Sequence, residues 1–245
     1  MRLPGAFRLE SGVEIESVEI AYRTWGRLDA SGSNAVLLCH ALTGSADADL
    51  WWNELFGSGR TLDPERGDFI ICSNVLGSCY GSTGPASAGP DGRPWGSAFP
   101  AVTIRDMVRA QAALLDHLGV RRLRLVAGGS MGGMQALEWP LLFPDRVDAV
   151  AAIGCSARHS AWCIGLSEAQ RQAITADPKW RGGRYPPADP PAAGLAAARA
   201  MAMCTYRSWA SFEQRFGRDL YAQESAEGGP APFAVESYLR HHGTK

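Results

Sequence analysis

Apolar residues along this chain gather in four short runs, each typical of a strand that is buried on both faces. The runs cover residues 34–39, 68–75, 123–127 and 149–155. Helical patterns alternate with these runs, which indicates βαβ units around a mostly parallel sheet. Residues 7–22 alternate instead between apolar and polar positions, and they predict two antiparallel strands or a hairpin at the edge of the sheet.

A helix is predicted to begin after Thr103 and to run to about Leu118. Thr103 fits the N-cap position, and Asp106 three residues later gives a capping-box-like pattern. The apolar residues of this stretch fall mostly on one face, and Gly119 is typical of a helix end. That face is expected to pack in the core of the protein.

Beyond residue 160 the pattern becomes helical. Residues 160–174 and 192–213 fit helices, residues 211–240 add short helical pieces, and no further run of the buried-strand type follows. We therefore predict a sheet-containing core over residues 1–159 and a helical cap over residues 160–245. Such a cap is expected over the carboxyl ends of the strands, where ligands bind in open α/β sheets.

Glycines surround Ser130 at the junction of the 123–127 run with a helical pattern. The spacing Gly128-x-Ser130-x-Gly132 fits the nucleophile elbow, a sharp strand-to-helix turn that exposes a serine hydroxyl. An ordinary serine in a glycine-rich turn is the alternative, but the strand before it and the helix after it favour the elbow. We predict that Ser130 is a catalytic nucleophile.

The loop after residues 34–39 is the expected source of a second group at this site. In folds that carry such an elbow, this loop supplies one N–H of the oxyanion hole, and the residue after the nucleophile supplies the other. We assign the two backbone donors to Leu42 and Met131. His40, in the same loop, is interpreted as a local hydrogen-bonding residue rather than a catalytic base.

Composition narrows the classes of function. Hydrophobic residues make up 46% and charged residues 20% of the 245 residues, which predicts a packed core. The net charge of −1 gives no indication of a nucleic-acid partner, and no apolar run is long enough to span a membrane. The six cysteines show no metal-ligand spacing, so we expect no metal site. We interpret them as buried free thiols in a reducing cytoplasm.

Several longer motifs run along the chain in one order. They are residues 21–26 (AYRTWG), 40–44 (HALTG), 72–77 (CSNVLG), 79–85 (CYGSTGP), 103–111 (TIRDMVRAQ), 128–139 (GGSMGGMQALEW), 215–218 (RFGR) and 235–239 (VESYL). Together they resemble the homoserine O-acyltransferases of the α/β-hydrolase superfamily, most often the acetyl-transferring kind. The resemblance implies an α/β-hydrolase fold with a mostly parallel sheet and a helical lid, and it covers the chain from end to end.

The resemblance also implies a reaction and its participants. Members of this family move an acetyl group from acetyl-CoA, a co-substrate, to the hydroxyl of L-homoserine in methionine biosynthesis, with no bound cofactor. Ser130 would carry the acyl group, and Arg199 falls where the family places an arginine that binds the homoserine carboxylate. The residues after Arg199 depart from the family, which often shows a Gly-His pair there. A homodimer built through the cap is the oligomer that the family suggests.

The base and the acid that a serine nucleophile needs are missing from the expected places. The family carries its aspartate and histidine beyond the cap, whereas the histidines after Ser130 here are His159, His241 and His242, none in such a setting. We therefore expect a C-terminally incomplete hydrolase fold, with the 149–155 strand as an unpaired edge and with impaired activity.

Four alternatives remain open from the sequence. The donor could be succinyl-CoA, or the acceptor could be serine. The chain could be a serine esterase on the same fold, with water as the acceptor. It could also be a non-catalytic remnant in which Ser130 forms no acyl-enzyme.

Overall fold

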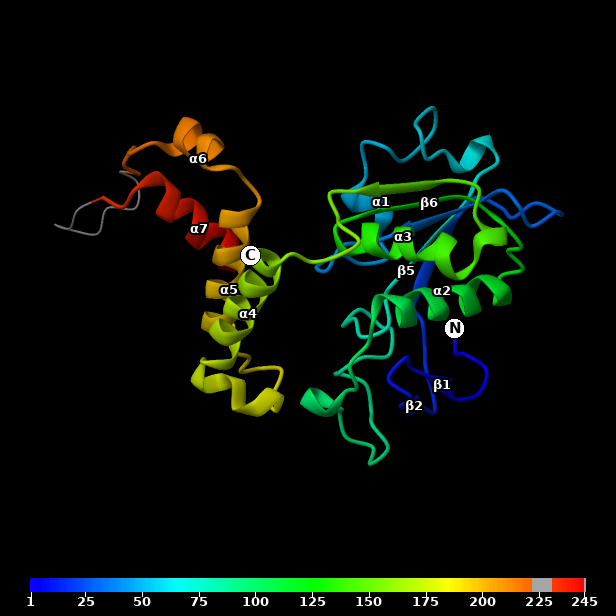
Figure 1. Ribbon diagram of the computed structural model, residues 1–245, viewed down its shortest axis with the longest axis horizontal. Helices are drawn as coiled ribbons and strands as arrows, with labels where there is room; N and C mark the ends of the chain where they lie inside the picture. The colour runs from blue at the N-terminus through cyan, green and yellow to red at the C-terminus, as the bar shows by residue number, and fades with distance from the viewer. Residues whose placement is uncertain (222–230, 245) are drawn as a thin grey trace. The chain divides into compact units, whose positions relative to one another are not determined.

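The computed structural model describes residues 1–221 and 231–244, and the chain divides into two compact units. The first unit, Met1–Arg158, contains the sheet, and the second, His159–Lys245, is helical (Figure 1). The sheet has five strands in the order β3-β5-β4-β6-β7. They are β3 (Tyr22–Trp25), β4 (Ala35–Cys39), β5 (Phe69–Ser73), β6 (Leu123–Gly129) and β7 (Val150–Ile153).

Strand direction follows the prediction of a mostly parallel sheet. Strands β5, β4, β6 and β7 pair in parallel, and only β3 is antiparallel to its neighbour, β5. The predicted hairpin is also present, as β1 (Phe7–Arg8) and β2 (Glu14–Ile15), but its place at the sheet edge was wrong. These strands form a separate two-stranded sheet. Strand β3 takes the free side of β5, so that edge is not available to the hairpin.

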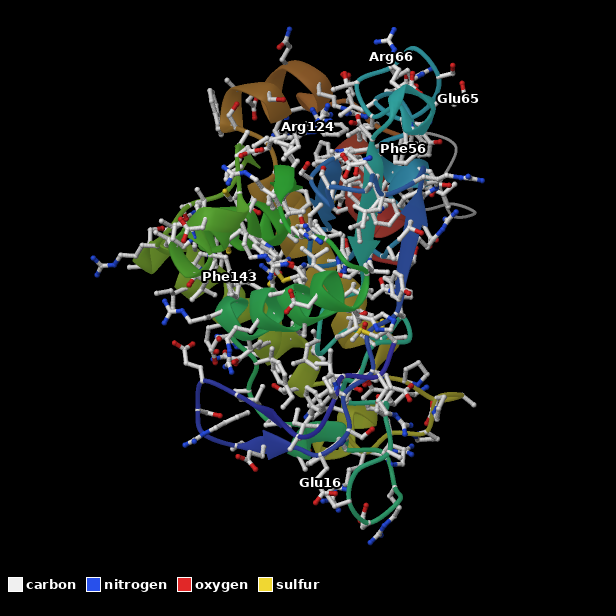
Figure 2. The ribbon with its side chains drawn as sticks, turned by 90° about the vertical axis from the view of Figure 1, so that its right-hand side faces the viewer. Glu16, Phe56, Glu65, Arg66, Arg124 and Phe143 are labelled. Atoms are coloured by element: carbon white, nitrogen blue, oxygen red, sulfur yellow. The ribbon has the colours of Figure 1, made fainter. Side chains whose placement is uncertain are left out.

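Two apolar cores cover the two faces of the sheet. Alternate residues of β4 point to opposite sides, with Leu37 in one core and Val36 and Leu38 in the other. The first core is closed by α2 (Ile104–His117) and α3 (Met131–Leu142), and the second by α1 (Ala48–Trp51). Phe143 packs against the first core and Phe56 against the second. Both side chains are labelled in Figure 2.

Helix α2 begins as its capping pattern predicted. The Asp106 N–H donates to Thr103 Oγ1 at 3.2 Å, and the Thr103 N–H donates to Asp106 Oδ2 at 3.1 Å. Asp106 also accepts a hydrogen bond from the Glu10 N–H at 2.8 Å. Asp106, in the first turn of α2, is therefore tied to the loop between β1 and β2, which holds the amino-terminal segment against the first core.

Strand β7 differs from its prediction as a strand buried on both faces. Within the described residues it pairs with β6 alone, so it is the edge that the sequence predicted. Helix α3 packs on one side of it, while Val150 and Ile153 are 36% and 54% exposed. An apolar sequence gives a buried strand only when both sheet faces and both neighbours are covered, and here they are not.

The second unit is built from α4 (Ala161–Thr175), α5 (Ala192–Thr205), α6 (Trp209–Phe216) and α7 (Ala234–Thr244). Helix α5 packs against both α4 and α7 (Figure 1). The helix predicted over 192–213 is in fact two, because Ser208 starts a new helix by accepting from the Ser211 N–H. Of the short helical pieces predicted over 211–240, residues 222–230 lie outside the described part.

Short 3-10 turns complete the structure at η1 (Pro64–Arg66), η2 (Gly96–Ala98), η3 (Pro144–Arg146) and η4 (Pro178–Gly183). Among the helices of the described residues, none combines the length and the apolar character that crossing a membrane requires. Nor do the described residues bring three or more histidine, cysteine or acidic side chains together in a way that could hold a metal ion.

Candidate functional site

Ser130 has a strained backbone at the junction of β6 and α3. Its φ of 56° and ψ of −122° lie in a region that side chains other than glycine rarely occupy. The Ser130 N–H donates to the Ile153 carbonyl at 2.9 Å, and its own carbonyl accepts from the Met134 N–H at 3.1 Å. Both neighbours, β7 and α3, therefore hold the turn in the strained form and leave Ser130 exposed.

Three glycines make this turn sterically feasible. A Cβ at Gly128 would lie 2.8 Å from the Cys39 carbonyl oxygen and would overlap the Gly132 backbone. At Gly132 it would overlap the same Cys39 carbonyl, and at Gly133 it would lie 2.6 Å from Cys155 Sγ. The glycine spacing therefore reflects the contact between the first turn of α3 and the end of β4, as expected of a nucleophile elbow.

The two predicted oxyanion donors, Leu42 and Met131, line the same cavity, which we call the acyl cavity. Its volume is about 280 Å³. Met131 is the first residue of α3, where the helix dipole favours a developing negative charge. In the part of the chain described, neither backbone N–H has a hydrogen-bond partner. Their role as a pair of oxyanion donors remains a prediction.

The rest of the acyl cavity is predominantly apolar. Its wall includes six apolar side chains: Val75, Leu76, Phe99, Pro100, Val102 and Met107. Cys79 and Tyr80 also line it, and no residue in the lining is charged. Much of the wall comes from the long irregular segment after β5.

A second cavity of about 420 Å³, the tryptophan cavity, has Gly129 in its wall. Trp51 and Trp52 line it, and their rings lie 4.9 Å apart. The acyl cavity has Met131 in its wall, so the residues on either side of Ser130 contribute to different cavities. Trp51 also anchors its own loop, because its Nε1 donates to the Ser45 carbonyl at 3.0 Å.

Asn74 connects the two loops that form the walls of both cavities. Its side-chain oxygen accepts from the Ala46 N–H at 2.7 Å, and its side-chain nitrogen donates to the Tyr80 carbonyl at 2.6 Å. Ser82 Oγ donates to the Asn74 carbonyl at 2.6 Å. These bonds fix the 74–82 segment against the loop that carries Leu42. Sequence reasoning missed Asn74, although a polar residue directly after a buried strand is a signal for such a role.

His40 is buried and bonded to the backbone at both ring nitrogens. Nδ1 lies 2.7 Å from the Ala41 carbonyl, and the Val75 N–H donates to Nε2 at 3.2 Å. These partners fit a neutral ring that carries its proton on Nδ1. Burial lowers the pKa of His40 from its usual value near 6.5, against a smaller opposing effect of the Ala41 hydrogen bond. His40 thus joins the loop bearing Leu42 to the segment after β5.

The buried His40 predicts that the first unit loses stability as the pH falls below about 6.5. The unfolded chain binds a proton at His40 near that pH, while the folded chain resists it, so acid favours unfolding. In His40→Gln the glutamine oxygen can still accept from Val75 but does not titrate. The free energy of unfolding in urea should fall less for this variant than for the wild-type chain between pH 7.5 and 5 (roughly the range in which histidine titrates). Equal losses in the two proteins would contradict the prediction.

The remaining predicted site residue, Arg199, belongs to the second unit. It lies half-buried on α5, and its Nε donates to the His242 carbonyl of α7 at 3.2 Å. His159 and His241 are in that unit too, and no histidine lines either cavity of the first. The assignment of Arg199 to a substrate carboxylate therefore stays a prediction.

The cysteines are only partly buried, contrary to expectation. Cys39 and Cys72 are buried, whereas Cys79, Cys163 and Cys204 are exposed. Burial raises the pKa of the Cys39 thiol to about 12, although its hydrogen bond with Gln111 opposes this shift. Cys39, which lines the tryptophan cavity, is thus a neutral thiol and a poor nucleophile near neutral pH.

This chain is similar to known proteins in both its sequence and its fold. Residues 34–238 match a family model described as the alpha/beta hydrolase fold. A homoserine O-acetyltransferase of Trichormus variabilis is 61% identical over 99% of this chain and 66% of its own length. The chain spans 61–66% of the length of the first three curated relatives.

Two solved structures show the same fold. Homoserine O-acetyltransferase from Bacillus anthracis superposes with a TM-score of 0.86 at 26% identity, over 99% of this chain and 69% of that one. An acetylester hydrolase from Corynebacterium glutamicum superposes with a TM-score of 0.81 at 31% identity, over 98% of this chain and 66% of that one. The fold therefore carries both acetyl transfer and acetyl-ester hydrolysis in other proteins.

Proposed function

This chain belongs to the homoserine O-acetyltransferases, a family of the α/β-hydrolase fold, and we propose from this that it transfers an acyl group through Ser130. We propose acetyl-CoA as the donor and L-homoserine as the acceptor, in methionine biosynthesis, with no bound cofactor. The observation that carries the proposal is the strained Ser130 elbow beside a cavity with two unbonded backbone N–H groups.

The proposed chemistry takes two steps. Ser130 Oγ attacks the thioester carbonyl, its proton passes to the departing CoA thiolate, and the N–H groups of Leu42 and Met131 stabilise the tetrahedral oxyanion. The homoserine hydroxyl then attacks the acyl-serine carbonyl. Its proton returns to Ser130 Oγ, and O-acetylhomoserine leaves. The same two backbone donors serve both steps because the oxyanion forms at the same place.

The second unit is proposed to act as a helical cap that supplies Arg199 to the homoserine carboxylate, for which a planar guanidinium is well suited. A homodimer through this unit is also proposed, from the family resemblance. The large exposed side chains Trp162 and Trp209 are apolar surface that such a contact would cover. Sedimentation of the purified chain tests the dimer.

We further propose that acetyl-CoA acylates Ser130 only slowly in this chain of 245 residues. A serine hydroxyl is a weak nucleophile without a base, and in the first unit no histidine lines either cavity next to the elbow. Hydrolysis of acetyl esters is the second candidate function, because the C. glutamicum acetylester hydrolase shares the fold. In that case water would replace homoserine as the acceptor.

The decisive experiment is mass spectrometry of the chain after incubation with acetyl-CoA. We expect a gain of one acetyl group, mapped by peptide analysis to Ser130, and no gain in Ser130→Ala. Adding homoserine should remove the label faster than buffer alone and should yield O-acetylhomoserine. Equal loss in buffer would favour the esterase, and an absence of label after prolonged incubation would support the non-catalytic alternative.

A further inference from the structure

A buried chain of side-chain amides lies beneath the elbow. Trp139 Nε1 donates to Gln111 Oε1 at 2.9 Å, and Gln111 Nε2 donates to Gln135 Oε1 at 2.8 Å. Gln135 Nε2 then donates to the Met131 carbonyl at 3.3 Å. Gln111 and Gln135 are 2% and 0% exposed, so water does not compete for these bonds. The network joins α2 to the first turn of α3.

The same network also reaches the strand that leads to the other oxyanion donor. Gln111 Nε2 lies 3.7 Å from Cys39 Sγ, at the last residue of β4. Leu42 follows Cys39 by three positions, and the Cys39 carbonyl packs directly against Gly132. The buried amide of Gln111 therefore contacts Cys39 at the end of β4. Through Gln135 it is also linked to Met131 at the start of α3.

We propose that Gln111 and Gln135 are positioning residues that set the separation and direction of the Leu42 and Met131 N–H groups. The inference rests on the proposed function, because an oxyanion hole matters only if Ser130 is acylated. Stabilisation by an oxyanion hole depends on donors held in place before the reaction. A fully bonded buried network supplies that rigidity, because each amide has only one arrangement that satisfies its partners.

Apolar side chains would fill this space at lower cost. Burying an amide is unfavourable unless its hydrogen bonds are met. The other buried side chains of α2 and α3 belong mostly to the apolar first core. Helix packing alone thus does not require glutamine at 111 and 135. The network gives what apolar packing does not, a directional link from α2 to both elements that carry the donors.

The test uses Gln111→Met, which keeps the side-chain length and removes the amide, in the whole chain labelled with ¹⁵N-methionine and ¹⁵N-leucine. We expect the amide resonances of Met131 and Leu42 to shift, and the rate of Ser130 acylation by acetyl-CoA to fall about tenfold. The concentration of acetyl-CoA that gives half the maximal rate should not change. Gln135→Met, which removes the bond to Met131, should act in the same direction and serves if Gln111→Met does not fold.

Val108→Ala is the matched control, since Val108 is fully buried on the same helix and has no part in the amide network. We expect it to lower the midpoint of urea unfolding but to leave both amide resonances and the acylation rate per folded molecule unchanged. If the glutamine variants behave like this control, the network only stabilises the fold and the proposal is wrong. If the wild-type chain is never acylated, the proposed function fails, but the amide resonances still decide whether the network positions the two donors.

Discussion

Replacing Gly132 by alanine is expected to lower the free energy of unfolding of the first unit by about 4 kcal/mol or more. The added Cβ would overlap the Cys39 carbonyl oxygen and lie 2.7 Å from the Cys39 carbonyl carbon. Both belong to the backbone of β4, which is buried and paired with β5 and β6. Overpacking against a side chain typically costs about 1–3 kcal/mol, and a fixed backbone leaves less room for relief.

Urea unfolding monitored by tryptophan fluorescence measures this effect, because Trp139 lies on α3 and is fully buried in the first core. Gly129→Ala is the matched control in the same turn. Its Cβ would meet only the Ile153 carbonyl, at 3.9 Å, which is an ordinary contact. The control should change the unfolding free energy by less than about 1 kcal/mol. Similar unfolding midpoints for the two variants would contradict the explanation of the glycine pattern.

The features that the sequence predicted well are set by nearby residues. The elbow depends on a few glycines around one serine, and the start of α2 depends on Thr103 and Asp106, three positions apart. Short apolar runs likewise identified the strands, because the side chains themselves favour burial. In each case the physical cause lies within a few residues of the pattern.

The features that escaped prediction depend on neighbours distant in sequence. Val150 and Ile153 are as apolar as the residues of β4, and their strand was predicted to be an edge of the sheet. The exposure of their side chains was not predicted, because it depends on which elements cover the sheet face at β7. Trp51 borders a cavity only because its loop meets the segment after β5. Gln111 and Gln135 appear in sequence as polar positions on two helices, and only packing of α2 on α3 brings their amides together.

Acetyl-CoA is expected to acylate Ser130 about 100-fold faster than succinyl-CoA. The acyl chain must extend from a carbonyl held at Leu42 and Met131, both in the wall of the acyl cavity. No residue in that wall is charged, and side chains such as Phe99 and Val102 are apolar. A succinyl carboxylate placed there would lose its hydration without gaining a cation. A penalty of about 3 kcal/mol corresponds to the expected ratio of rates.

Butyryl-CoA separates charge from size in this comparison, because its acyl chain has the length of succinyl but no carboxylate. The acyl cavity, at about 280 Å³, has room for more than two carbons, so butyryl transfer should be closer in rate to acetyl than to succinyl transfer. The measurement is the initial rate of Ser130 labelling by each thioester, followed by mass spectrometry. Succinyl and butyryl rates that are equally low would mean that cavity size, not charge, selects the donor. A succinyl rate above the acetyl rate would require a cation near the cavity, and it would overturn the assignment of acetyl-CoA as the donor.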